Sequence, residues 1–266
     1  MAKLLQDLVY QEESPSIYTT ALSGITLLFL AYLGISEALG NHLKYSKFWN
    51  VNSQKSGGGI KLSSRTGMLL LYSPAAVAGL ASFLIFPGGE IRFLMLKLAI
   101  TMHFSKRVLE SLFVHKYSGG MMLDSVVIIS SSYLFAAAGM IYIHHMTLEA
   151  TEPLVDLKYL GLLLFLVGIA GNFYHHYLLS KLRKKNEKDY KIPTGGLFDL
   201  VICPHYLFEI LGLLGISFIS QTLFSYSCAI GCAFYLIGRS YATRQWYLSK
   251  FEIFPKNVKA LIPFVF

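Results

Sequence analysis

Seven stretches of about 20 predominantly apolar residues constrain the fold of this 266-residue chain more than any other feature. A hydrocarbon core about 30 Å thick is crossed by about 20 residues of helix, so each stretch is long enough to span a bilayer. The expected spans are 17–39, 66–86, 91–114, 123–145, 157–179, 206–223 and 224–241. Only Ser220, Gln221 and Thr222 separate the last two spans, so the alternative there is one long kinked helix. The sequence therefore predicts an all-α polytopic membrane protein with seven transmembrane helices.

The charged residues predict an orientation for these spans. Charged residues make up only 14% of the chain, against about 25% in a typical soluble domain. The net charge of +8 does not require a nucleic-acid partner, because membrane proteins gather Lys and Arg in cytoplasmic loops. Of the 23 Lys and Arg residues, 16 fall in one set of alternating connections together with the C-terminal segment, and three fall in the opposite set. This asymmetry predicts a lumenal N-terminus and a cytosolic C-terminus, with membrane lipids as partners.

Ionisable residues cluster within the third span. His103, Lys106, Arg107 and Glu110 follow the spacing i, i+3, i+4 and i+7, which places them on one face of a helix. Each charged residue at mid-bilayer costs about 2.5 to 3.5 kcal/mol on insertion scales. One interpretation is a structural ion pair between Arg107 and Glu110 near the cytoplasmic end. The pattern favours the other interpretation, a polar cavity that faces the cytosol.

Two later segments add polar groups on the same predicted side. Asn172, His175 and His176 end the fifth span and precede a basic stretch over 181–191, while His205 and Glu209 stand at i, i+4 in the sixth span. Amide, imidazole and cationic groups beside a cytoplasmic opening suit a polyanionic cofactor or a phosphorylated headgroup. The alternatives are a lysine collar that contacts anionic lipid and a structural pair of His205 with Glu209.

Neither the histidines nor the cysteines indicate a metal site. The pairs His144-His145 and His175-His176 lack partners at the spacing of membrane di-iron enzymes, so no metal is expected. The cysteines Cys203, Cys228 and Cys232 fall in or beside predicted spans, which favours inert thiols. We expect residues 1–266 to form a single domain, with the first span acting as its own insertion signal.

The last hundred residues or so resemble the steroid 5α-reductase family. The matching segments are Tyr190-Lys191-Ile192-Pro193, Gly195-Gly196-Leu197-Phe198, Pro204-His205-Tyr206 with Glu209, Arg239, Trp246-Tyr247, Phe251, Pro255-Lys256 and Lys259-Ala260-Leu261-Ile262-Pro263-Phe264. Around His103-Phe104-Ser105-Lys106-Arg107, the third span is more similar to the very-long-chain enoyl-CoA reductases. The resemblance implies a seven-span enzyme of the endoplasmic reticulum membrane that uses NADPH to reduce a carbon–carbon double bond conjugated to a carbonyl.

The resemblance also implies a set of cofactor-binding residues. Residues 1–145 would supply the spans of the substrate pocket and residues 146–266 the NADPH-binding part. His205 stands where the family usually has Asn, and His176 stands where steroid reductases have Asp. The residues that would surround NADPH are Arg107, Asn172, Arg183, Tyr190, His205, Glu209, Arg239 and Tyr247.

Two acids that the steroid 5α-reductases use to polarise the substrate carbonyl are replaced here. Tyr72 occupies the position of their second-span Glu, and Phe104 occupies that of their third-span Tyr. In the enoyl-CoA branch, the counterparts of Lys106 and Tyr206 are thought to serve. We therefore expect the substrate oxygen to be stabilised by Tyr72, or by Lys106 with Tyr206, unless Tyr72 only packs between helices.

Four functions are consistent with these residues. The favoured one is reduction of a 3-oxo-Δ4 steroid or related terpenoid enone taken from the bilayer, and the nearest alternative is trans-2-enoyl-CoA reduction in very-long-chain fatty acid elongation. An isoprenylcysteine-type methyltransferase would bind S-adenosylmethionine instead of NADPH. A non-catalytic or transport protein would tolerate loss of Arg183 or Glu209. The sequence predicts neither the product stereochemistry nor the oligomeric state.

Overall fold

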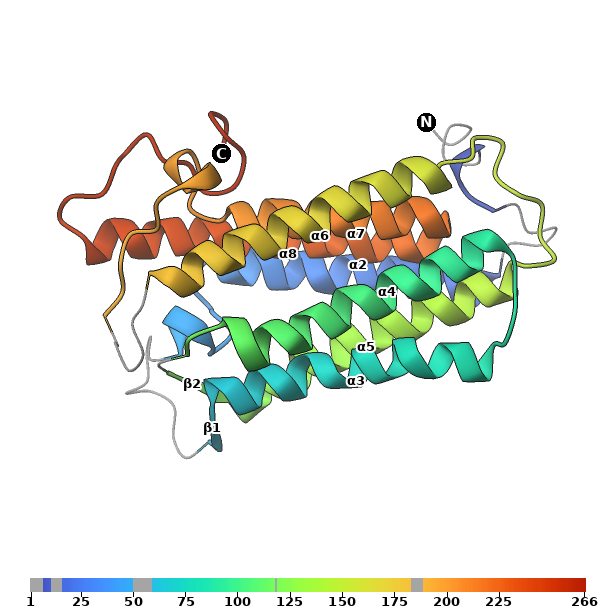
Figure 1. Ribbon diagram of the computed structural model, residues 1–266, viewed down its shortest axis with the longest axis horizontal. Helices are drawn as coiled ribbons and strands as arrows, with labels where there is room; N and C mark the ends of the chain where they lie inside the picture. The colour runs from blue at the N-terminus through green and yellow to red at the C-terminus, as the bar shows by residue number, and fades with distance from the viewer. Residues whose placement is uncertain (1–6, 11–15, 50–58, 118, 183–188) are drawn as a thin grey trace.

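Seven long helices form the protein over the residues that the structure describes. The computed structural model describes residues 7–10, 16–49, 59–117, 119–182 and 189–266. Within these residues, the long helices lie side by side in one bundle (Figure 1). Their bounds are α2 Ile17–Ala38, α3 Ser64–Ile85, α4 Ile91–Leu109, α5 Leu123–Met146, α6 Lys158–Lys181, α7 Pro204–Ser220 and α8 Leu223–Lys250. The all-α prediction is confirmed, and each expected span contains one helix.

Four of these helices are long and apolar enough to cross a membrane, namely α2, α3, α5 and α6. Helix α7 is apolar but shorter, and α4 carries Arg92, Lys97, Lys106 and Arg107. The helices thus fit a membrane protein. Seven crossings and the orientation of the termini stay predictions. Helix α2 begins at one end of the bundle and α8 ends at the other (Figure 1), which is consistent with an odd number of spans.

The last two predicted spans are separate helices. Gln221 ends α7 in the left-handed region with φ 49°, and Thr222 and Ser225 form a capping box that begins α8. The helix of the seventh expected span, 224–241, extends beyond that span, because α8 continues to Lys250. Its extra turns are retained because Tyr247 packs into a second buried cluster with Ile202, Phe254 and Leu261.

Short elements gather at the end of the bundle that holds the C-terminal segment (Figure 1). Strand β1, Lys61–Ser63, pairs antiparallel with β2, Gly120–Met122. This pairing joins the segment just before α3 to the segment just before α5. Three-residue strands are too short to show a periodicity, which is why the sequence did not predict this ribbon. One π-helical turn, η3 Glu110–Val114, extends α4, and the 3₁₀ turns η1, Ser46–Phe48, and η4, Gly196–Asp199, lie in the connections.

Glycines allow two helix pairs to approach closely. A Cβ atom added at Gly238 of α8 would clash with the backbone of Gly34 in α2, and one added at Gly168 of α6 would clash with the backbone of Gly212 in α7. Small residues at such crossings are typical of helices packed in membranes, where backbones rather than large side chains make the contact. These crossings bring α2 to α8 and α6 to α7.

The C-terminal segment closes one end of the bundle. Val201 and Lys259 form a parallel bridge, and the amides of Ile202 and Cys203 donate to the carbonyls of Lys259 and Ala260 at 2.9 and 3.1 Å. The three cysteines, of which Cys203 and Cys228 are buried, are all free thiols as expected.

Candidate functional site

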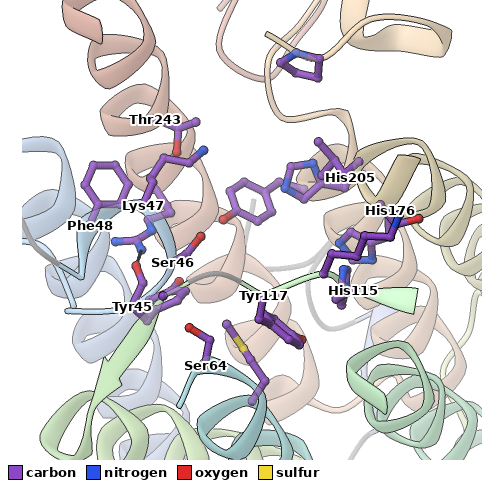
Figure 2. Close-up of a pocket in the computed structure, with 18 of the residues that line it drawn as sticks. Tyr45, Ser46, Lys47, Phe48, Ser64, His115, Tyr117, His176, His205 and Thr243 are labelled. Carbon is purple, nitrogen blue, oxygen red and sulfur yellow. Dashed lines mark hydrogen bonds between the residues drawn. The ribbon is translucent and has the colours of Figure 1, made fainter. Parts of the chain in front are cut away.

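A polar cavity of about 250 Å³ lies at the end of the bundle that carries the short elements. Residues from η1, Tyr45 and α8 line one side, and His176 and His205 line the other, with His115 beside them (Figure 2). Among the described residues, its charged lining consists of the five cations Lys47, Arg107, Lys116, Lys191 and Arg239 and the single carboxylate of Glu209. The cavity therefore favours an anionic ligand.

Arg107 links three helices at the inner wall of this cavity. Its guanidinium donates to Glu110 Oε2 at 2.8 Å and to the Tyr72 hydroxyl at 2.5 Å. His176 Nδ1 lies 2.9 Å from Arg107 Nη1 and 3.1 Å from Glu110 Oε2. Because the Tyr72 oxygen accepts a hydrogen bond from a cation, its own proton remains available to a second acceptor. The predicted Arg107–Glu110 ion pair and the predicted polar cavity are thus both present.

Asn172 connects Lys106 to the sixth predicted span. The Lys106 ammonium donates to Asn172 Oδ1 and pairs with Glu110 Oε1 at 3.0 Å. The Asn172 amide nitrogen donates to the His205 carbonyl at 2.8 Å and to Glu209 Oε2 at 3.4 Å. Lys106 does not line the polar cavity, whereas Tyr72 and Tyr206 do. The catalytic roles given to these three residues stay predictions.

Arg239 is held by a residue that the sequence analysis did not single out. Its guanidinium donates to both carboxylate oxygens of Glu37 at 2.8 and 2.7 Å, and to the carbonyls of Leu43 and Tyr45. The rings of Tyr45 and Phe48 lie 4.0 and 4.3 Å from the guanidinium carbon. Arg239 therefore shapes the polar cavity by fixing the connection after α2. A carboxylate within an apolar span was the signal that would have identified Glu37.

Aromatic residues form the outer wall of the polar cavity. The Tyr190 and Trp246 rings are 4.8 Å apart, and the Tyr247 hydroxyl donates to the Lys191 carbonyl at 3.4 Å. The ammonium of Lys47 lies 4.9 Å from the Tyr247 ring. No pattern in the sequence distinguished Lys47 from other loop lysines. Arg183, which was also expected at this site, lies outside the described residues.

The histidines of α6 have different roles. His175 Nδ1 donates to the Gly171 carbonyl at 2.7 Å, and His175 Nε2 accepts from the Leu197 amide at 3.2 Å. His175 thus anchors η4 from within the bundle. His205, in contrast, lines the polar cavity with a buried Nδ1 that has no hydrogen-bond partner in the described part of the chain.

Glu110, His115 and His176 bring three metal-ligating atoms within 4.8 Å of one another. The Arg107 guanidinium already lies 2.8 Å from Glu110 Oε2 and 2.9 Å from His176 Nδ1. A cation at this position would be repelled by that guanidinium, so we assign the three side chains to the Arg107 network. The prediction that the protein binds no metal remains untested.

An apolar cavity of about 580 Å³ adjoins the polar one. Its walls come from α2, α4, α5, α7 and α8, and include Phe29, Ile100, Phe104 and Phe135. Four of the residues that the structure describes line both cavities: Tyr133, Glu209, Tyr235 and Leu236, which we call the junction. Both cavities thus take residues from both sides of the boundary at residue 145 that was expected to separate a substrate part from a cofactor part. That division stays a prediction.

A basic polar cavity that meets an apolar cavity inside a bundle of apolar helices defines a membrane protein that can hold a charged molecule beside a lipid. A family model described as 3-oxo-5-alpha-steroid 4-dehydrogenase matches residues 124–266, more than half of the chain. The chain therefore belongs to the steroid 5α-reductase family.

Individual relatives come from both branches of this family. A very-long-chain enoyl-CoA reductase of Dictyostelium discoideum is 34% identical over 171 residues, which cover 62% of this chain and 55% of the relative. The steroid 5-alpha-reductase DET2 of Gossypium hirsutum is 43% identical over 112 residues, or 40% of this chain and 42% of the relative. The human 3-oxo-5-alpha-steroid 4-dehydrogenase 1 is 36% identical over 126 residues, which cover 47% of this chain and 49% of the relative. The matches thus span about half the length of these curated relatives.

Proposed function

We propose that the protein is an NADPH-dependent reductase of a carbon–carbon double bond conjugated to a carbonyl in a lipid, located in the endoplasmic reticulum membrane. The observation that carries the proposal is the junction, where a cation-lined cavity meets an apolar cavity in a member of this family. The favoured substrate is a 3-oxo-Δ4 steroid or related terpenoid enone. The substrate would enter the apolar cavity from the bilayer, since Ile25 and Phe29 of its lining are also exposed on the surface of the bundle.

The polar cavity has the chemistry that a phosphorylated dinucleotide requires. Lys47, Lys116 and Lys191 would hold phosphate groups. The Nδ1 of His205 and the Nε of Arg107 are buried polar atoms without a partner among the described residues, and a ligand would satisfy them. The enclosed volume of about 250 Å³ is smaller than typical cofactor sites of about 300 to 1,000 Å³. We therefore expect only one end of the cofactor to be enclosed, with the rest lying along Tyr190 and Tyr247.

The chain's own residues would stabilise the oxygen of the substrate. Bound NADPH would supply the hydride that the β-carbon receives. As the β-carbon is reduced, negative charge develops on the carbonyl oxygen, and a phenol placed beside it lowers the barrier. The Tyr72 hydroxyl, oriented by its hydrogen bond from Arg107, has a proton to donate. The proton added next to the carbonyl would come from a tyrosine or from water.

One observation supports the second candidate, a trans-2-enoyl-CoA reductase of fatty acid elongation. The Dictyostelium relative aligns over 171 residues, a longer match than those of the steroid 5-alpha-reductases quoted above. Membranes that contain the protein should be incubated with NADPH and either a 3-oxo-Δ4 steroid or a trans-2-enoyl-CoA, and the products followed by mass spectrometry. Steroid reduction alone would support the favoured substrate. Turnover of neither compound would contradict both.

The variant Tyr72→Phe tests whether the Tyr72 hydroxyl takes part in the reduction. Loss of one oxyanion donor lowers kcat by about 10²- to 10³-fold in other enzymes, so a fall of this size is expected with little change in the KM for NADPH. Tyr32→Phe, on the exposed face of α2, is the matched control. Equal activity of the two variants would show that Tyr72 is not part of the mechanism.

A thermal-unfolding assay of the wild-type protein tests the methyltransferase alternative. Protection by S-adenosylmethionine instead of NADPH would favour a methyltransferase.

A further inference from the structure

We infer that Tyr133 of α5 is a catalytic residue whose hydroxyl donates a hydrogen bond to the carbonyl oxygen of the lipid substrate at the junction. The inference rests on the proposed function, because it assumes a lipid that carries a carbonyl. It assigns a role to a residue that neither the sequence patterns nor the family resemblance singled out.

The position of Tyr133 is the first argument. A lipid carbonyl that is to react must lie where the apolar cavity meets the polar one, and only Tyr133, Glu209, Tyr235 and Leu236 line both cavities among the described residues. Tyr72 and Tyr206 line the polar cavity alone, and His103 lines the apolar cavity alone. A second hydrogen-bond donor for the carbonyl, beside Tyr72, is therefore sought among the four residues of the junction.

Of these four residues, Tyr133 has a hydroxyl that no other described residue already engages. The Tyr235 hydroxyl is paired with the Tyr45 hydroxyl at 2.8 Å. The Glu209 carboxylate oxygen Oε2 already accepts from the Asn172 amide at 3.4 Å. Leu236 is apolar. The Tyr133 hydroxyl has no hydrogen-bond partner within the part of the chain that the structure describes, although a hydroxyl in a largely apolar wall requires one.

The ring of Tyr133 is held in place by its neighbours. It stacks on Tyr72 with ring centroids 5.6 Å apart and an interplanar angle of 19°, and it contacts Phe104 with centroids 5.5 Å apart. Tyr72 is itself bonded to Arg107. The Tyr133 hydroxyl is thus carried on a ring fixed from two sides, and its donor does not have to reorganise when charge develops on a ligand oxygen.

In a largely apolar cavity, one hydrogen-bond donor is enough to orient the carbonyl of the substrate. Pockets for apolar ligands are oriented by a few polar groups in a mostly apolar wall. A 3-oxo-Δ4 steroid presents one carbonyl oxygen at the end of an apolar skeleton, and a trans-2-enoyl thioester presents one carbonyl beside its double bond. In either substrate, Tyr133 would bind the neutral carbonyl and bind more strongly the enolate oxygen that forms as the β-carbon is reduced.

The test compares Tyr133→Phe with the wild-type protein in ligand binding. The probes are a 3-oxo-Δ4 steroid whose carbonyl carbon carries a heavy isotope and the same steroid without the 3-oxygen. One lost hydrogen bond should weaken binding of the ketone by about 2- to 12-fold and leave binding of the oxygen-free steroid unchanged. The isotope-edited infrared carbonyl stretch, lowered in the wild-type complex, should rise in the variant. Tyr142→Phe on the exposed face of α5 is the matched control.

The outcomes separate this inference from the proposed function. If Tyr133→Phe keeps the wild-type carbonyl frequency and ketone affinity, the inference is wrong even when the wild-type protein reduces the steroid. If the carbonyl shift depends on Tyr133 but no substrate is reduced with NADPH, the inference stands and the proposed reaction is wrong. If the wild-type protein binds neither this steroid nor a trans-2-enoyl thioester labelled in the same way, both are overturned.

Discussion

Arg107 illustrates, at the scale of a single residue, how burial creates a site. A guanidinium in a membrane helix is costly unless its charge and its donors are satisfied. Here a carboxylate from its own helix, a phenol from α3 and an imidazole from α6 all meet it. Spacing along α4 predicted the pairing with Glu110. Tyr72 and His176 are 35 and 69 positions away, so only the packing of three helices could bring them to Arg107.

Replacing the carboxylate of this network should be strongly destabilising. Glu110 is 1% exposed and pairs with Arg107 and Lys106. We expect Glu110→Gln to lower the free energy of unfolding by about 3 to 5 kcal/mol, because two partly buried cations would lose their buried counter-ion. Thermal unfolding in detergent measures this. Glu152→Gln is the control, since that carboxylate is 55% exposed and lies 3.7 Å from Arg92. Equal losses in the two variants would contradict the prediction.

His115 should make stability depend on pH. Burial, reinforced by the charge of Arg107, lowers the pKa of His115 to about 4, from an ordinary value of about 6.5. Below pH 6.5 the unfolded chain therefore binds a proton that the folded chain does not, and stability falls as the pH drops from 6.5 towards 4. The loss approaches about 3 kcal/mol at the lower end. His115→Asn should flatten this part of the curve of melting temperature against pH, and an unchanged slope would contradict the assignment.

At the scale of secondary-structure elements, the contact between α2 and α8 positions one wall of the polar cavity. Gly34 and Gly238 let the two backbones approach, and the Glu37–Arg239 pair lies at the same crossing. Because Arg239 also bonds the carbonyls of Leu43 and Tyr45, the crossing controls where Tyr45 enters the cavity. Helix packing and cavity shape are thus coupled here.

A methyl group at this crossing should separate the two helices. Gly238→Ala places a Cβ against the Gly34 backbone, and we expect a loss of about 1 to 3 kcal/mol in unfolding free energy from overpacking. Gly24→Ala in α2 is the control because no atom lies within 4 Å of its added Cβ. Since Ala favours helix over Gly by about 1 kcal/mol, Gly24→Ala should be neutral or stabilising. Melting temperatures in detergent distinguish the two variants.

At the scale of the whole molecule, the polar cavity and most of the basic connections lie at the same end of the bundle. Lys47, Lys116 and Lys191 line the cavity there, while Arg92 pairs with Asp156 at the other end. Loops of membrane proteins that are rich in Lys and Arg remain on the cytoplasmic side of the membrane. We therefore expect the polar cavity to open to the cytosol, where a nucleotide cofactor is available.

The orientation can be measured directly. A glycosylation acceptor sequence fused before Met1 should be modified in microsomes, and the same sequence fused after Phe266 should not, because only lumenal acceptors are glycosylated. An acceptor placed in the connection between α3 and α4 should also be modified if its distance from the membrane permits. Modification of the C-terminal fusion alone would reverse the predicted topology and place the polar cavity in the lumen.

The positions of the helices could be predicted because the length of an apolar run is a local property. Three consecutive polar residues indicated a turn between α7 and α8, but the sequence left one long kinked helix open, and the structure decided between the two. The ribbon of β1 and β2 and the extension of α8 to Lys250 were not predictable, because each depends on contacts between segments far apart in the chain. No sequence pattern indicated the π-helical turn after α4. Most of the residues expected around a cofactor do line the polar cavity. Asn172 instead supports it from behind.

The sequence by itself determined that this chain is helical and apolar, which family it belongs to, and that cations on one helical face had to be paired. Each of these follows from residue type and short-range spacing. Only the tertiary structure decided which partner each cation received and that Tyr133 and Tyr235 stand where the two cavities meet. The physical reason is that hydrogen bonds and cavity walls form between helices, whose relative rotation depends on close crossings such as Gly34 with Gly238 rather than on the pattern of any one helix.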